Sequence, residues 1–335
     1  MNVKQFRLSA WSDAAGRPLN EDSFLISKDL SSGQWSFETN ETVSLGRFGA
    51  LMVVCDGMGG MNAGEVASAL AVDAVKERFS PALLTDETVA SPESVGRFIT
   101  EAIVEADRRI KHEAKNDAEK AGMGSTIVLA WLLGENVHIG WCGDSRAYRF
   151  NPASGLERLS HDHSYVQELV DTGRLSPSLA RQHPDNNIIT RSLGDSGKEA
   201  QPEVVSLTLC RNDVLLLCSD GLYGALDDSV LETVIRDNRS DMRTCRDALL
   251  AASKQEGWTD NVTLALCRAV SGYVKASRCT LIADTVKQTD NQLINTPQKE
   301  RLIDKMKKMR FIIPAVLTII AIILIALLLC KHFNI

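Results

Sequence analysis

The chain has 335 residues, of which 44% are hydrophobic, and its formal net charge is −6. This much apolar material can form a real core, which excludes an intrinsically disordered chain, and the negative charge argues against a nucleic-acid partner. The length allows one large domain or two ordinary ones.

Short apolar runs with β-type composition predict eight strands, which in chain order are 22–26, 48–55, 125–133, 136–142, 145–150, 204–209, 213–218 and 261–267. Apolar residues spaced three and four apart predict four helices, at 63–79, 95–115, 227–237 and 242–257. Tight turns at 132–136 and 142–145 predict two hairpins. Because the helices come in pairs between hairpin-linked strands, the pattern favours an antiparallel α+β layered fold over a parallel doubly wound sheet.

The eight cysteines lie scattered along the chain without a C-x-x-C pair, at Cys55, Cys142, Cys210, Cys218, Cys245, Cys267, Cys279 and Cys330. Several stand inside apolar runs, where a thiol behaves as a small hydrophobic side chain. We therefore expect reduced core cysteines in a cytosolic domain, without disulfide or zinc roles.

The C-terminal part changes character, and we divide the chain into a catalytic-type domain at 1–270, a polar linker with a basic juxtamembrane segment at 271–310, an apolar helix at 311–330 and a short tail at 331–335. The apolar segment carries no charge and would span about 30 Å as a helix, which matches a bilayer. The basic cluster that precedes it is expected to stay in the cytoplasm. The sequence thus predicts a single-pass C-terminal membrane anchor with the domain in the cytoplasm.

Acidic residues stand where several of the predicted strands begin or end. In an antiparallel arrangement these ends can share one edge, which gathers six carboxylates: Glu21, Asp22, Asp56, Asp144, Asp220 and Asp260. Six carboxylates in one place repel each other unless cations lie among them. Oxygen-only ligands suit hard ions, so the pattern predicts Mg²⁺ or Mn²⁺.

The stretch after Asp56 is rich in glycine. The backbone carbonyl of Gly57 can bind a cation beside Asp56. Gly59, Gly60 and Gly64 allow close backbone approach before the helix begins.

At this point the chain resembles the type 2C family of metal-dependent protein serine/threonine phosphatases, in its bacterial form. The resemblance covers about residues 8–268 and rests on eight motifs in family order: "RPLNEDSF", "DGMGGMNAGEVAS", "GSTIVLAWL", "GDSRAYR", "LSHDHS", "ITRSLG", "LLLCSDGL" and "TDNVT". It implies a fold of two packed antiparallel sheets flanked by helix pairs, a four-layer αββα sandwich.

The resemblance also implies roles for individual residues. Asp56 resembles the carboxylate that bridges two metal ions, and Gly57 and Glu21 resemble ligands of the second ion. Arg17 matches the arginine that binds the substrate phosphate.

Three further acids complete the implied site. Asp220 and Asp260 resemble ligands of the first ion, and Asp22 a carboxylate that holds its waters. Asp144 resembles the residue that, with Asp220, holds a weaker third ion in bacterial members.

The sequence departs from the family at two positions where relatives carry histidine, Met58 and Met61. The candidate proton donors to the leaving group are then a metal-bound water, His161 and His163. The two histidines are also interpreted as surface-loop residues. His183 is interpreted as structural. Residues 163–190 match the family's flap, a segment that selects substrates or is an inert surface.

The predicted function is hydrolysis of phosphoserine and phosphothreonine in cytoplasmic proteins, by a hydroxide between two metal ions, opposing a protein kinase at the membrane. Three alternatives remain: a catalytically silent membrane-bound phosphoprotein-binding module, a metallophosphoesterase of small molecules, and an adaptor that acts only through its tail.

Overall fold

The computed structural model describes residues 5–36, 42–59, 63–271 and 281–282. The chain divides into two units, residues 1–283 and 284–335, and every described residue belongs to the first. The predicted apolar helix at 311–330, the tail at 331–335, most of the 271–310 segment, Gly60 and Met61 lie outside the described residues. Among the residues that are described, no helix is both long enough and apolar enough to cross a membrane.

The strands of the first unit form two sheets in which every pairing is antiparallel. The first sheet has the order β10 (Gly155–Arg158), β9 (Arg146–Asn151), β12 (Val214–Cys218), β13 (Val262–Ala269), β1 (Gln5–Asp13) and β4 (Thr42–Ser44). The second sheet has the order β14 (Leu281–Ile282), β11 (Glu203–Thr208), β8 (Asn136–Cys142), β7 (Ile127–Leu133), β5 (Ala50–Met58), β2 (Asp22–Asp29) and β3 (Gln34–Ser36). A short strand, β6 (Gly124–Ser125), pairs with β5 beside this path.

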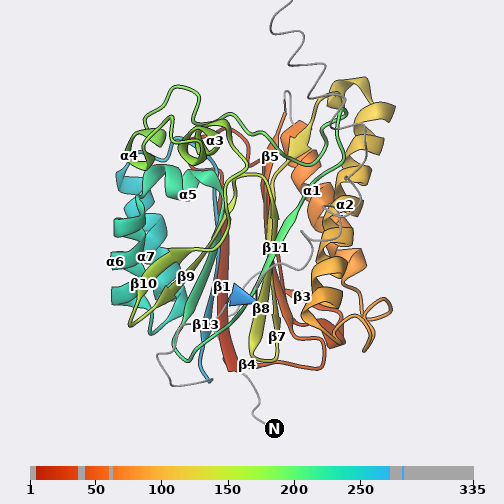
Figure 1. Ribbon diagram of the computed structural model, residues 1–335, viewed down its shortest axis with the longest axis vertical. Helices are drawn as coiled ribbons and strands as arrows, with labels where there is room; N and C mark the ends of the chain where they lie inside the picture. Colours follow the sequence, from red (N-terminus) through yellow and green to blue (C-terminus); the bar gives the residue numbers. More distant parts are fainter. Residues whose placement is uncertain (1–4, 37–41, 60–62, 272–280, 283–335) are drawn as a thin grey trace, which may run out of the picture. The chain divides into compact units, whose positions relative to one another are not determined.

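Two helix pairs cover the outer faces of the two sheets, and the shorter α3, α4 and α5 lie near one end of the sheets (Figure 1). Their bounds are α1 (Ala63–Arg78), α2 (Pro92–Asn116), α3 (Tyr165–Asp171), α4 (Pro177–Ala180), α5 (Asp220–Ala225), α6 (Asp228–Asn238) and α7 (Met242–Gln255), with 3₁₀ turns at Leu30–Ser32 and Ala118–Lys120. Helices α1 and α2 pack on the second sheet, and α6 and α7 on the first. The layers are therefore helix pair, sheet, sheet, helix pair.

Three apolar cores hold these layers together. Between α1, α2 and the second sheet, Phe79 meets Phe98 and Trp131 edge-on, with ring centroids 5.1 and 4.9 Å apart. A second core lies between the sheets and a third beneath α6 and α7. Because β5 is covered on both faces, its residues from 50 to 55 are all buried, which explains why that strand reads as an unbroken apolar run.

The start of α2 shows how local chemistry sets an element's limits. Ser91 caps the helix by accepting a hydrogen bond from the Ser94 N–H, and Pro92 occupies the first turn, where its missing N–H is harmless. The helix therefore begins three residues before the predicted 95–115. Apolar periodicity marks the buried face of a helix, and the cap lies outside that face.

The predicted antiparallel α+β fold with two packed sheets and flanking helix pairs is confirmed. The hairpin predicted at 132–136 is also found, because β7 and β8 are paired across it. The hairpin predicted at 142–145 is wrong. Strand β8 belongs to the second sheet and β9 to the first, so this turn passes from one sheet to the other. The prediction also missed β1, which lies between β13 and β4.

Five cysteines among the described residues are free and buried: Cys55, Cys142, Cys218, Cys245 and Cys267. Burial raises the pKa of the Cys55 thiol well above its usual range. A thiol with a raised pKa is a poor nucleophile at neutral pH, so these cysteines serve the core.

Candidate active site

Two aspartates face each other across the β2–β5 ladder. The antiparallel register places Asp22 directly opposite Asp56, an arrangement that brings like charges together. Asp22 is buried, and Ser219 donates a hydrogen bond to its Oδ2 at 2.7 Å. Its other oxygen, Oδ1, is buried with no hydrogen-bond partner among the described residues. Burial raises the pKa of Asp22 to about 7, and the charges of Asp220 and Asp260 add to the effect.

The backbone of Asp56 is fixed by the neighbouring chain. Its N–H donates to Thr126 Oγ1 at 3.1 Å, and its carbonyl accepts from the Thr126 N–H at 2.8 Å. The pKa of the Asp56 carboxyl is raised well above its usual range, first by burial and then by the charges of Asp22, Asp220 and Asp144. The side chain is therefore held among other acids.

Asp220 approaches from the first sheet, and Asp144 approaches from the turn between the two sheets. Asp220 is the first residue of α5, directly after β12, and Asp144 stands in the turn that crosses from β8 to β9. Burial and the charge of Asp220 raise the pKa of Asp144 to about 7. Burial and the charge of Asp260 raise the pKa of Asp220 in the same direction. The crossing turn thus brings Asp144 to the edge that the four aspartates share, where Asp22 and Asp144 are buried and Asp56 and Asp220 partly buried.

Gly57 lies where three backbone segments meet. Its N–H donates to the carbonyl of Glu21 at 3.1 Å. A Cβ at this position would lie 2.0 Å from the carbonyl oxygen of Gly64 and 2.6 Å from that of Glu21, so only glycine fits. The Glu21 carboxyl lies against Gly64, where an added Cβ would be 2.5 Å from Oε1. Burial raises the pKa of Glu21.

The exposed side of the site holds an ion pair. Arg17 Nη2 lies 2.9 Å from Asp260 Oδ2, and the two side chains are 51% and 38% exposed. Asn261 fixes the turn that carries Arg17, because its amide donates to the carbonyls of Ala14 and Leu19 at 2.9 and 2.8 Å. Its Oδ1 accepts from the Glu21 N–H at 2.8 Å. One asparagine therefore places both Arg17 and Glu21.

The two histidines considered as proton donors have different surroundings. His161 is half exposed and contacts Asp171 at 3.1 Å. His163 is buried, and its Nδ1 accepts from the Gly143 N–H at 3.1 Å, which makes it a support for the turn that carries Asp144. His183 Nδ1 accepts from the Asp185 N–H at 3.2 Å, a local contact that agrees with the structural interpretation.

The donor set fits a hard divalent cation in its chemistry. Within 5–36, 42–59 and 63–271, no group of three or more His, Cys, Asp or Glu side chains is placed so that it could hold a metal ion. The buried acids instead interact with one another, and the partnerless Oδ1 of Asp22 is an orphaned oxygen of the kind that a cation or its water would satisfy. Carboxylate and carbonyl oxygens are the ligands that Mg²⁺ and Mn²⁺ prefer.

Comparison with known proteins agrees with this arrangement. The family model described as "Protein phosphatase 2C" matches residues 47–262. The serine/threonine phosphatase stp of Listeria welshimeri is 36% identical over 220 residues, which are 64% of this chain and 83% of the relative. A crystal structure of a bacterial serine phosphatase has 31% identity and a TM-score of 0.67, over 79% of this chain and 98% of its own.

One of the similar solved structures contains metal ions. The catalytic domain of the serine/threonine protein phosphatase PstP, solved with two manganese ions, has 25% identity and a TM-score of 0.63, over 80% of this chain and 100% of its own. The chain belongs to the protein phosphatase 2C family and is a serine/threonine protein phosphatase of this type. Mn²⁺ and Mg²⁺ are the ions that this family uses.

The structure brings Asp22, Asp56, Asp144 and Asp220 into one electrostatic group, with Glu21 and Gly57 beside it and the Arg17–Asp260 pair at its exposed side. The residues that hold these groups were not predicted from the sequence. They are Thr126, Ser219, Tyr223 and Asn261. All four lie inside or next to the motifs quoted above. A single sequence, however, does not reveal which group a hydroxyl or amide side chain will hydrogen-bond.

Proposed function

We propose that the chain hydrolyses phosphoserine and phosphothreonine in proteins with the help of two core Mg²⁺ or Mn²⁺ ions. The observation that carries the proposal is a group of four aspartates, of which Asp22 and Asp144 are buried and Asp56 and Asp220 partly buried. Their pKa values are raised by burial and by neighbouring acids. Such a group binds divalent cations because they relieve both the repulsion and the cost of burial.

Specific oxygens would hold the ions. Asp56 would bridge the two, and the Gly57 carbonyl and Glu21 would serve the second ion. Asp220 and Asp260 would serve the first ion, with Asp22 holding its waters. Asp144 and Asp220 would hold a weaker third ion.

Metal ions held by these residues would supply Lewis acidity and would lower the pKa of a water molecule. The chain's own contribution is to place the charges and to bind the phosphate. Arg17 contacts Asp260 through Nη2, and its guanidinium is half exposed, at the edge where a phosphoprotein would arrive. Its planar fork suits two phosphoryl oxygens at once, which a lysine cannot match.

The test is phosphate release by the full-length chain, in mild detergent, from a phosphothreonine peptide and from a sugar phosphate. Each is assayed with Mn²⁺, with Mg²⁺ and with EDTA. We expect turnover of the peptide with either metal and none with EDTA. Turnover of the sugar phosphate alone would favour the small-molecule phosphoesterase. No turnover from the folded chain with any metal would favour the silent binding module.

We also propose that the chain is anchored in the membrane by residues 311–330, with its enzymatic part in the cytoplasm, where it opposes a serine/threonine kinase. The support is the uncharged apolar segment and the basic cluster before it. Removal of residues 301–335 should move the protein from the membrane fraction to the soluble fraction. A truncated chain that stays in the membrane fraction contradicts the anchor, and one that keeps full activity contradicts the tail-only adaptor.

A further inference from the structure

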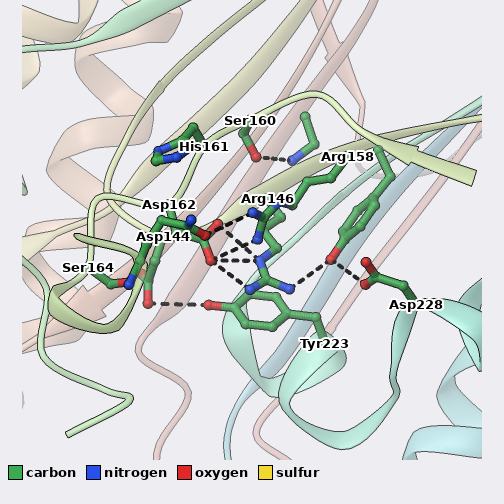
Figure 2. Close-up of polar contacts among 12 residues, drawn as sticks. Asp144, Arg146, Arg158, Ser160, His161, Asp162, Ser164, Tyr223 and Asp228 are labelled. Carbon is green, nitrogen blue, oxygen red and sulfur yellow. Dashed lines mark hydrogen bonds and ion pairs between the residues drawn. The ribbon is translucent and has the colours of Figure 1, made fainter. Parts of the chain in front are cut away.

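Helix α5 carries two residues that face the crossing turn. Asp220 begins the helix and Tyr223 follows three residues later, a spacing that places both side chains on one side of the helix. The Tyr223 hydroxyl donates to Asp144 Oδ2 at 3.2 Å (Figure 2). Asp144 comes from the β8–β9 turn, so this hydrogen bond joins the two elements that carry Asp144 and Asp220.

The Tyr223 ring is itself held by a clamped arginine. The Arg146 guanidinium carbon lies 3.6 Å from the ring centroid. Asp162 fixes this guanidinium by accepting from Nε at 3.0 Å and from Nη2 at 2.6 Å. The Asp162 side chain is only 7% exposed. Figure 2 shows the Arg146 side chain beside the Tyr223 ring. Stacking on a guanidinium whose plane is fixed restricts the ring.

We propose that Tyr223 is a positioning residue that holds the Asp144 carboxylate toward Asp220 and thereby sets the affinity of the weaker cation site. The inference rests on the proposed function, because Asp144 and Asp220 matter for cation binding only if the chain binds metal. Partners that orient a ligand from outside the metal's own shell strongly affect metal affinity. In this role the Tyr223 hydroxyl acts through Asp144, and Arg146 and Asp162 act through the ring.

The chain offers a matched control in Tyr148. Its hydroxyl also belongs to the Arg146 network, accepting from Nη1 at 2.9 Å and donating to Asp228 at 3.1 Å. Like Tyr223, it loses one hydroxyl in a change to phenylalanine. Its hydroxyl contacts Arg146 and Asp228, whereas the Tyr223 hydroxyl contacts Asp144, so the two substitutions differ in whether they release Asp144.

The experiment compares the full-length chain with Tyr223→Phe, Tyr148→Phe, Asp144→Asn and the double variant Tyr223→Phe/Asp144→Asn. Mn²⁺ binding is measured by titration calorimetry, the Mn²⁺ concentration for half-maximal phosphatase activity by assay, and folding by thermal unfolding. We expect Tyr223→Phe to weaken the weakest Mn²⁺-binding event by about 10- to 100-fold. Tyr148→Phe should leave it unchanged. The double variant should match Asp144→Asn, since the hydroxyl acts through that carboxylate.

Two results would overturn the inference while leaving the proposed function intact: unchanged Mn²⁺ binding in Tyr223→Phe, or equal weakening in Tyr148→Phe. The second would assign the effect to packing around Arg146. If Tyr223→Phe does not fold, Asp144→Asn becomes the deciding variant. Unchanged Mn²⁺ binding in Asp144→Asn would show that Asp144 does not hold a cation, and Tyr223 would then have no cation site to affect. If the parent chain binds no Mn²⁺ and releases no phosphate, the inference fails together with the proposed function.

Discussion

The candidate active site has a buried half and an exposed half, and they manage charge in opposite ways. In the buried half, Asp22, Asp56, Asp144 and Asp220 form no ion pair with a lysine, arginine or histidine among the described residues, and their pKa values are raised. In the exposed half, Arg17 and Asp260 neutralise each other at 2.9 Å. The buried half therefore needs positive charge from outside the chain, and the exposed half already has a cation to present to an incoming phosphate.

The largest effect is expected from the removal of one acid of the buried half. Asp220→Asn should lower kcat/KM at saturating Mn²⁺ by more than about 100-fold, because even partners outside the metal's ligand shell are worth 10- to 100-fold. The fold should survive, since the neutral side chain relieves repulsion. Steady-state assays with the phosphothreonine peptide measure the loss.

The matched control is Asp73→Asn, which makes the same change at an exposed position on α1. It should keep the parent's activity. Full activity in Asp220→Asn would mean that the buried acids are not the catalytic centre.

The exposed half is tested by keeping the charge and changing its geometry. Arg17→Lys should raise KM and lower kcat/KM by roughly 10-fold, since a charge-assisted hydrogen bond contributes about 1.5–3 kcal/mol and the lysine cannot bind two oxygens in one plane. Arg47→Lys is the control, because Arg47 also forms an exposed ion pair, with Asp86, and lies outside the proposed site. Equal kinetics for the two variants would contradict a phosphate-binding role for Arg17.

Much of this architecture could be predicted from the sequence. Apolar periodicity located α1, α2, α6 and α7 and most long strands, and acids at strand ends indicated a shared edge. The crossing turn at 142–145 could not be predicted, because a short polar turn between two apolar runs looks the same whether the strands pair or diverge. The position of Asp144 in the site, between the two sheets, follows only from how the sheets pack on each other.

The hydrogen bonds that hold the site could not be predicted from the sequence for a related reason. The Ser219–Asp22 contact joins residues 197 positions apart, and the Tyr223–Asp144 contact joins residues 79 positions apart. A hydroxyl has many satisfactory partners, so residue type alone does not select one. Carboxylates near several strand ends, in contrast, can be grouped by topology.

A further prediction concerns how the stability of the metal-free chain depends on pH. Burial raises the pKa of Asp22 to about 7, far above the value of an unfolded aspartate. The folded state therefore binds more protons than the unfolded state between about pH 4 and pH 7. Its unfolding free energy falls as pH rises through that window, by up to roughly 1.4 kcal/mol per pH unit for each such group.

Asp22→Asn should flatten this fall, because the amide cannot lose a proton and its oxygen can still accept from Ser219. Urea unfolding in EDTA from pH 5 to pH 8 measures the slope, with Asp73→Asn as the control that keeps it. Excess Mn²⁺ should reduce the fall in the parent, since the cation stabilises the charged carboxylates of the folded state. An identical slope in the parent and in Asp22→Asn would show that Asp22 is not among the acids that titrate, and the contrast between the two halves would then rest on Asp56, Asp144 and Asp220.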